Sequence, residues 1–260
     1  MNDLSYIQYE ENEGVGIITI NSPKVNALTL PLLQELRDTV YHCKYDEKVR
    51  CVVLTAAGKF FCAGADLKLM MNAGGEIKVL IKKMAETLHD VISMLMRMEK
   101  PVITAINGYV AGGGYGLAIA GDLVIAAESA KFTMAYTASG LSPDGASTYL
   151  LPRLIGHRRA MELAITNRTL TAQEALNWHM ITQVVPDDQL HFTALALAKK
   201  LAQGPTDAYA YVKKLLMMTD NNTLEEQTDF EKEGIAVQLS SYNGQEGIKS
   251  FIEKRKPEFQ

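Results

Sequence analysis

Two glycine-rich turns are the first residues in this sequence whose types and spacing suggest chemistry. They are "FFCAGADL" at 60–67 and "AGGGYGL" at 111–117. Each follows an apolar, β-rich run and leads into a helical one, so a ligand can approach its backbone closely. Two such turns can direct two N–H groups at one oxygen and stabilise the negative charge of an enolate or tetrahedral intermediate. For either turn alone, close packing of strand against helix explains the glycines equally simply.

A later turn in the sequence carries another candidate group. It is Asp144, in "SGLSPDGAS" at 139–147. Pro-Asp-Gly is an ordinary turn signal, because Pro presets φ, Asp bonds its own backbone and Gly allows positive φ. Asp144 is therefore either a turn residue or an acid–base group, and local sequence does not separate the two.

Composition excludes several classes of function. The chain has 260 residues, of which 47% are hydrophobic and 22% charged, and its net charge is -4. This is typical of a globular enzyme-sized chain and argues against a nucleic-acid partner. "GGGYG" lacks the spacing of a dinucleotide fingerprint, and no P-loop occurs. No apolar run reaches about 18 residues, so no membrane span is expected.

Cysteine usage and the N-terminus predict the compartment. Cys43, Cys51 and Cys62 are unevenly spaced, which suits free thiols in a reducing compartment and no metal site. The first residues, "MNDLSYIQYEENEG", are polar and acidic, unlike a signal peptide. We therefore expect a cytoplasmic protein.

The element pattern predicts an α/β core. A strand pair is expected over 6–21, and buried strands over 49–57, 101–107, 122–129 and 181–186. Residues 58–70 are expected to form a loop. Helices are expected over 30–46, 75–99, 148–167 and 171–180, with Thr29 and Thr171 as caps. Strands that alternate with helices favour parallel pairing.

The C-terminal part has a different character. From 187 onward the period is helical, over 187–203, 205–219, 223–242 and 244–254. A boundary near 195 would divide a core of residues 1–195 from a helical region of residues 196–260. The apolar residues of that region need a cover, which either the core or another subunit could supply.

Several stretches together resemble the crotonase (enoyl-CoA hydratase/isomerase) superfamily. They are "NALT", "VVLTAAGKFFCAGADLK", "KPVITAINGYVAGGGYGLAIAGDLVIAAESAKF", "LPRLIGHRRAMELAITNRTLTAQEAL" and "FIEKRKPEF". The resemblance implies a spiral of ββα turns with a C-terminal helical trimerisation region. It also implies a homotrimer or dimer of trimers that acts on an acyl-CoA thioester. Coenzyme A would arrive with the substrate, and no metal or other cofactor is implied.

The same resemblance assigns binding roles. It implies that the backbone N–H groups of Ala65 and Gly113 form an oxyanion hole. The backbone around Ala63–Leu67, which includes Asp66, would contact the adenine and pantetheine of CoA. Lys254, in "EKRKP", matches a basic residue that reaches the CoA phosphates, although a solvated basic tail would look the same. Asp66 also suits a backbone-capping role.

The acid–base positions of the family differ here. Hydratases of the family carry two glutamates, and the matching positions hold Gly116 and Tyr136. Hydration needs one group to activate water and one to protonate carbon. A two-glutamate hydratase is therefore disfavoured, and Tyr136 is expected to line the acyl pocket.

Asp144 matches the single aspartate of acyl-CoA isomerases of the ring-epoxide phenylacetyl-CoA type. One carboxylate beside an enolisable thioester can move a proton from one carbon to another. The favoured prediction is therefore an isomerase in which Asp144 carries the proton.

His89 supports an alternative. With Asp144, it matches the histidine and aspartate of 4-chlorobenzoyl-CoA dehalogenase, in which the aspartate is a nucleophile and the histidine activates water. Tyr136 and Ala65 depart from the dehalogenase pattern. An aryl-CoA dehalogenase or thioesterase using Asp144 and His89, a hydratase-like lyase with a replacement acid, and a catalytically silent CoA-binding subunit remain as alternatives.

Overall fold

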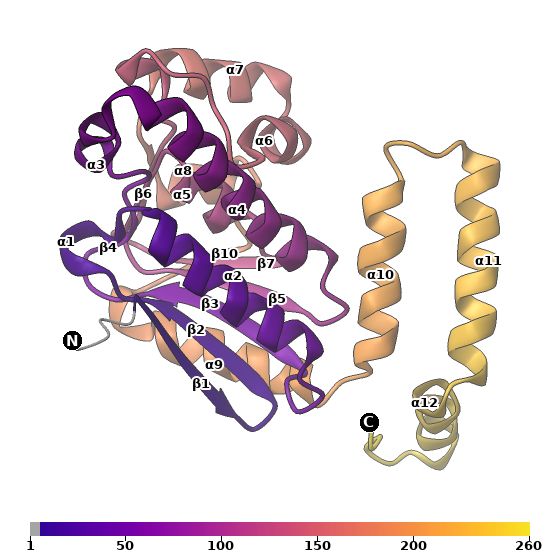
Figure 1. The fold of residues 1–260 in the computed structure, drawn as a ribbon. Coiled ribbons are helices and arrows are strands. Elements are labelled where there is room, and N and C mark those ends of the chain that lie inside the picture. The colour runs from indigo at the N-terminus through magenta and orange to yellow at the C-terminus, as the bar shows by residue number, and fades with distance from the viewer. Residues whose placement is uncertain (1–5) are drawn as a thin grey trace.

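The structure is a computed structural model that describes residues 6–260; residues 1–5, part of the N-terminus that the sequence predicts to carry no signal peptide, lie outside it. Two sheets form the core (Figure 1). The larger has six strands in the order β1-β2-β3-β5-β7-β10, and the smaller has four in the order β4-β6-β8-β9. The strands of the larger sheet are β1 (Ile7–Asn12), β2 (Val15–Ile20), β3 (Cys51–Ala56), β5 (Val102–Ile106), β7 (Leu123–Ala127) and β10 (Gln183–Val185).

The second sheet makes the fold a spiral. Its strands are β4 (Phe60–Cys62), β6 (Tyr109–Ala111), β8 (Lys131–Thr133) and β9 (Leu170–Thr171). In each spiral turn the chain passes from the larger sheet to the smaller one and then into a helix, as in β3-β4-α3 and β5-β6-α5. The pairs β2–β3, β3–β5, β5–β7, β4–β6 and β6–β8 are all parallel, which confirms the predicted pairing.

Twelve α-helices among the described residues connect and cover these sheets. They are α1 (Pro23–Asn26), α2 (Leu30–Tyr45), α3 (Leu67–Asn72), α4 (Ile77–Arg97), α5 (Gly114–Ile119), α6 (Ser147–Ile155), α7 (His157–Thr166), α8 (Ala172–Asn177), α9 (Leu190–Ala202), α10 (Thr206–Met218), α11 (Leu224–Ser240) and α12 (Tyr242–Glu253). The Thr29 cap and the capping box of Thr171 with Glu174 are confirmed. None of the helices that the structure describes is long and apolar enough to cross a membrane.

Two sequence expectations are corrected. Residues 60–62 were expected within a loop but form β4, which is too short to show a period. The single helix expected over 148–167 is two helices, because Gly156 takes a φ of 80° and separates α6 from α7. This conformation is open to glycine at little cost.

The chain leaves the core later than the sequence suggested. Residue 195 lies inside α9, whose buried face packs with the strands of the larger sheet. The next three helices, α10, α11 and α12, stand apart from the two sheets (Figure 1). The division at 195 stays a prediction, but the helix ends place the change of direction between Ala202 and Thr206.

A partly buried ion pair fastens the first of these helices to the core. Lys213 of α10 lies with its Nζ 2.8 Å from Asp122 Oδ2 and also donates to the carbonyl oxygens of Leu95 and Lys100. Asp122 in turn accepts a hydrogen bond from the Val102 N–H at 2.7 Å. Burial raises the pKa of Asp122 and lowers the pKa of Lys213, and the opposite charge of each partner opposes the shift in the other.

The Lys213 contact predicts a stability difference. Replacing Lys213 by Met removes the cationic partner of Asp122, which then keeps the Val102 N–H as a donor. It also removes the donor to the Leu95 and Lys100 carbonyl oxygens, so the free energy of unfolding should fall by about 2 kcal/mol. Urea denaturation measures the change. Lys214→Met is the matched control, because Lys214 is the exposed neighbour on the same helix; it should change the value by less than about 0.5 kcal/mol. Equal losses in the two variants would contradict the anchoring role.

Candidate active site

The two glycine-rich turns are in contact in the folded chain. Gly64 has a φ of +85°, and a Cβ on it would lie 3.0 Å from the Ala111 carbonyl oxygen and 3.2 Å from the Cα of Gly112. Gly112 itself has a φ of +50°. A side chain at Gly64 would push the turns apart, so both the backbone angle and the close approach require glycine there.

Leu28 joins the two turns from a third segment. Its N–H donates to the Gly64 carbonyl oxygen at 2.7 Å, and its carbonyl oxygen accepts from the Asp66 N–H at 3.0 Å. The end of its side chain lies 2.9 Å from the position that a Cβ on Gly113 would take. The segment around Leu28 therefore fixes the first turn by its backbone and touches the second by its side chain.

The two predicted N–H groups are available to a ligand. Across residues 6–260, the N–H groups of Ala65 and Gly113 have no hydrogen-bond acceptor within the chain. Ala65 is half-buried and Gly113 is buried. Such donors are costly to leave unpaired in the absence of water or a ligand, and an oxyanion is the acceptor that gains most from a pair of them.

The backbone of the turn that carries Asp144 is held by hydrogen bonds. The Asp144 carbonyl oxygen accepts from the Ser147 N–H at 3.2 Å and from the Ser147 hydroxyl at 2.7 Å. Gly145 and Ala146 both take positive φ, 59° and 56°, and α6 begins directly afterwards. A non-glycine residue in this region is held there by its surroundings, and buried Ser147 supplies part of that constraint.

The side chain of Asp144 lies close to the second glycine turn. Its Oδ1 accepts a hydrogen bond from the Tyr136 hydroxyl at 2.5 Å and lies 3.9 Å from the position of a Cβ on Gly113. His89, on α4, approaches the same turn, since its Nε2 accepts from the Gly145 N–H at 3.2 Å. The structure thus brings Asp144, Tyr136, His89 and Gly113 together, although they come from four separate segments.

Gly116 explains why no acid stands after the glycine cluster. A Cβ on Gly116 would overlap the Gly145 carbonyl oxygen and would also lie 2.9 Å from Ile92. The turn behind Asp144 therefore occupies the volume that a side chain at 116 would need. An acid at 116 and the turn in its present position exclude each other.

Two titratable groups beside the Asp144 carboxylate stay protonated. Burial, together with the neighbouring charge and hydrogen bond of Asp144, raises the pKa of Tyr136, so its phenol stays protonated. Burial raises the pKa of the nearby Cys62 thiol to about 12. The walls beside Gly113 and Gly145 are apolar, formed in part by Leu88 and Ile92.

In the part of the chain that the structure describes, the other residues predicted to bind CoA make no hydrogen bond to the Asp144 cluster. The N–H of Ala63 donates to the Val25 carbonyl oxygen, and Asp66 caps α3 by accepting from two N–H groups, which confirms its capping role. Leu67 is exposed at the start of α3. Lys254 is exposed at the end of α12, in the part of the chain that stands away from the sheets, and makes no hydrogen bond to the Asp144 cluster (Figure 1).

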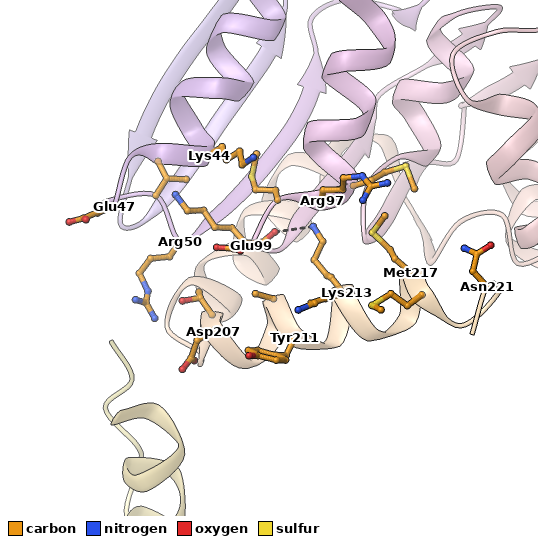
Figure 2. Close-up of a pocket in the computed structure, with 18 of the residues that line it drawn as sticks. Lys44, Glu47, Arg50, Arg97, Glu99, Asp207, Tyr211, Lys213, Met217 and Asn221 are labelled. Carbon is orange, nitrogen blue, oxygen red and sulfur yellow. Dashed lines mark hydrogen bonds between the residues drawn. The ribbon is translucent and has the colours of Figure 1, made fainter. Parts of the chain in front are cut away.

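A groove lies elsewhere in the molecule, away from the Asp144 cluster. The groove, of about 950 Å³, separates α10 from the ends of α2 and α4, and it is lined by Lys44, Arg97 and Lys213 among others (Figure 2). None of its lining residues belongs to the Asp144 cluster. The candidate chemistry is therefore assigned to the contact of the three turns and not to this groove.

Comparison with known proteins decides the family. The model of the family described as enoyl-CoA hydratase/isomerase matches residues 10–260. The chain belongs to this family.

Relatives agree over almost the whole chain. The family member is 38% identical over 258 residues to 1,2-epoxyphenylacetyl-CoA isomerase of Escherichia coli (strain K12), covering 98% of each chain. It is 35% identical to 4-chlorobenzoyl coenzyme A dehalogenase-2 of Arthrobacter sp, covering 97% of this chain and 92% of that one. A crystal structure of enoyl-CoA hydratase from Bacillus anthracis superposes with a TM-score of 0.91 at 33% identity, over 98% of both chains. The spiral of ββα turns is thus the crotonase fold that the resemblance implied.

The sequence did not reveal how the cluster is assembled. The Tyr136–Asp144 bond, the Ser147 contacts and the place of Leu28 join residues with no common period along the chain. The glycine at 116 was the one available signal, because a glycine inside a helix suggests a close approach.

The contact at Gly116 predicts a further stability difference. Gly116→Ala should lower the free energy of unfolding by about 2 kcal/mol, because the added methyl group must displace the Gly145 carbonyl or Ile92. Urea denaturation again supplies the measurement. Gly75→Ala is the control, since a Cβ on Gly75 meets no atom within 4 Å. A Gly116→Ala protein as stable as the parent would show that the turn is not seated on α5.

Proposed function

We propose that this family member is an acyl-CoA isomerase in which Asp144 moves a proton between carbons of the acyl group. The observation that carries the proposal is the position of the Asp144 carboxylate, 3.9 Å from the Cβ position of Gly113 and thus beside one of the two unpaired N–H groups. The positions that carry glutamates in hydratases of the family hold Gly116 and Tyr136. One carboxylate therefore serves as base and then as acid.

In this mechanism the thioester oxygen accepts hydrogen bonds from the N–H groups of Ala65 and Gly113. Asp144 removes a proton from the α-carbon, and the electron pair of that C–H bond moves into the enolate, whose oxygen the two N–H groups stabilise. The protonated Asp144 then returns the proton to the γ-carbon, and the double bond shifts by one position. Atoms and charge balance without another reactant.

Binding of the CoA portion is proposed on the same basis. The backbone of Ala63–Leu67, with Asp66 at its turn, would contact the adenine and pantetheine, and Lys254 would reach the phosphates. Tyr136 would border the acyl group beside Asp144. We propose no metal or organic cofactor beyond the CoA that the substrate brings.

A hydrolytic enzyme is the second candidate, and the hydrogen bond of His89 makes it less favoured than the isomerase. An aryl-CoA dehalogenase or thioesterase would use Asp144 with His89 as the base that activates water, and the dehalogenase of Arthrobacter is among the relatives. Here the Nε2 lone pair of His89 accepts the Gly145 N–H at 3.2 Å. A lone pair engaged in this way is not free to accept a proton from water, so the isomerase is favoured. A hydratase-like lyase would need a replacement acid.

We also propose that the protein is a homotrimer, or a dimer of trimers, in the cytoplasm. Exposed apolar side chains on the C-terminal helices support assembly, namely Leu216, Ile235, Val237, Ile248, Phe251 and Ile252. A monomer rarely exposes such a contiguous set. The free state of Cys43, Cys51 and Cys62 supports a reducing compartment.

The role of Asp144 is tested by Asp144→Asn, which keeps the shape and removes the base. The α-proton exchange of phenylacetyl-CoA in deuterated water, followed by NMR, and the conversion of a 3-enoyl-CoA should both fall by at least about a hundredfold. Crotonyl-CoA hydration and halide release from 4-chlorobenzoyl-CoA, measured on the parent protein, separate the lyase and hydrolase alternatives. Unchanged proton exchange in Asp144→Asn would sink the assignment, and no exchange or turnover by the parent protein would favour a silent CoA-binding subunit.

Assembly is tested by sedimentation. The parent protein should sediment with a mass that is a multiple of three chains, and Ile235→Glu, at a side chain 68% exposed on α11, should reduce that mass. Val79→Glu is the control, because it makes the same chemical change at a 63% exposed residue of α4. A parent protein that sediments as a single chain would contradict the trimer.

A further inference from the structure

A side-chain hydrogen bond joins Tyr136 to Asp144 in the site. The Tyr136 hydroxyl donates to Asp144 Oδ1 at 2.5 Å and lies 3.4 Å from the Asp144 carbonyl oxygen. Tyr136 is only 9% exposed and belongs to the buried core. Its ring cannot move far without disturbing that core, so the hydroxyl holds the carboxylate from a fixed position.

Other polar atoms of the turn are also bonded, whereas one oxygen of the Asp144 carboxylate has no partner among the described residues. Ser147 donates to the Asp144 carbonyl oxygen, and His89 accepts from the Gly145 N–H. Within residues 6–260, no hydrogen bond uses Asp144 Oδ2. The carboxylate therefore has one oxygen that is fixed by the protein and one that is open to a ligand.

We propose that Tyr136 is a positioning residue, which binds Asp144 Oδ1 so that Oδ2 is the oxygen that carries the proton. This inference rests on the isomerase function proposed above. It adds to the acyl-pocket role of Tyr136 a second role that acts through Asp144. Fixing one oxygen orients the other, and a reacting group held in one orientation gains rate without any new contact to the substrate.

Tyr136 can donate this hydrogen bond only while its phenol is protonated. Burial and the adjacent carboxylate both raise the pKa of Tyr136 and oppose its ionisation. It therefore remains a donor at neutral pH.

Few other titratable groups face this pair. The titratable groups that the structure places against it are His89 from α4, through Gly145, and the Cys62 thiol from β4, which burial keeps protonated. His89 contacts the backbone of the turn and not the carboxylate. A loss of rate after substitution of Tyr136 alone thus reports on the Tyr136–Asp144 bond.

The test is Tyr136→Phe, with proton exchange of phenylacetyl-CoA as the readout. We expect kcat to fall by roughly tenfold, the effect of one lost charge-assisted hydrogen bond, with KM nearly unchanged. Tyr109→Phe is the matched control, since it removes a hydroxyl that donates to Thr133 at 2.8 Å and leaves the turn untouched.

A second substitution keeps the test decisive if Tyr136→Phe does not fold. Fluorotyrosine at 136 keeps the shape and the donor, so kcat should stay near that of the parent protein. An unchanged kcat in Tyr136→Phe, or an equal loss in Tyr109→Phe, would overturn the positioning role. If Asp144→Asn is inactive while Tyr136→Phe matches the parent, only this inference fails; if Asp144→Asn is fully active, the proposed function itself fails.

Discussion

The close approach of the Gly145 carbonyl to Gly116 is the contact on which the site depends. A turn can lie against a helix at this distance only where the helix presents no side chain. Because the turn is seated there, Asp144 arrives beside Gly113, at the end of the same helix. The glycine at 116 thus excludes an acid at that position and leaves room for the turn that carries Asp144. The acid–base group and the shared pair of N–H groups are coupled through packing and not through sequence proximity.

The site combines parts of different rigidity. The N–H groups of Ala65 and Gly113 lie at the ends of strands of the smaller sheet, in turns that touch each other and are joined by Leu28. Asp144 lies on a turn that is not part of a sheet and needs contacts from Ser147 and α5 to stay in place. Backbone donors built on paired strands suit a role that every member of a family shares, whereas a carboxylate on a turn can be exchanged with little effect on the sheets.

Much of this arrangement could be predicted from the sequence, and the exceptions have a common cause. Buried strands such as 51–56 and the amphipathic α4 follow from apolar runs and periods, and caps such as Thr29 follow from local chemistry. The residues of β4 and the break at Gly156 are short-range features without a period. The Lys213–Asp122 pair and the Tyr136–Asp144 bond depend on segments that meet only after folding. Residue type indicates that a buried charge needs a partner but not which residue provides it.

The contact of His89 shows how one scaffold can separate proton transfer from hydrolysis. While its Nε2 accepts the Gly145 N–H, the imidazole stabilises the turn and keeps its lone pair from water. Activation of water would require that bond to break, which would free the backbone N–H of Gly145 and loosen the carboxylate next to it. A turn that needs His89 as an acceptor is therefore compatible with Asp144 as a proton carrier and poorly compatible with His89 as a base. On the proposed function, this one hydrogen bond to the backbone favours proton transfer over hydrolysis.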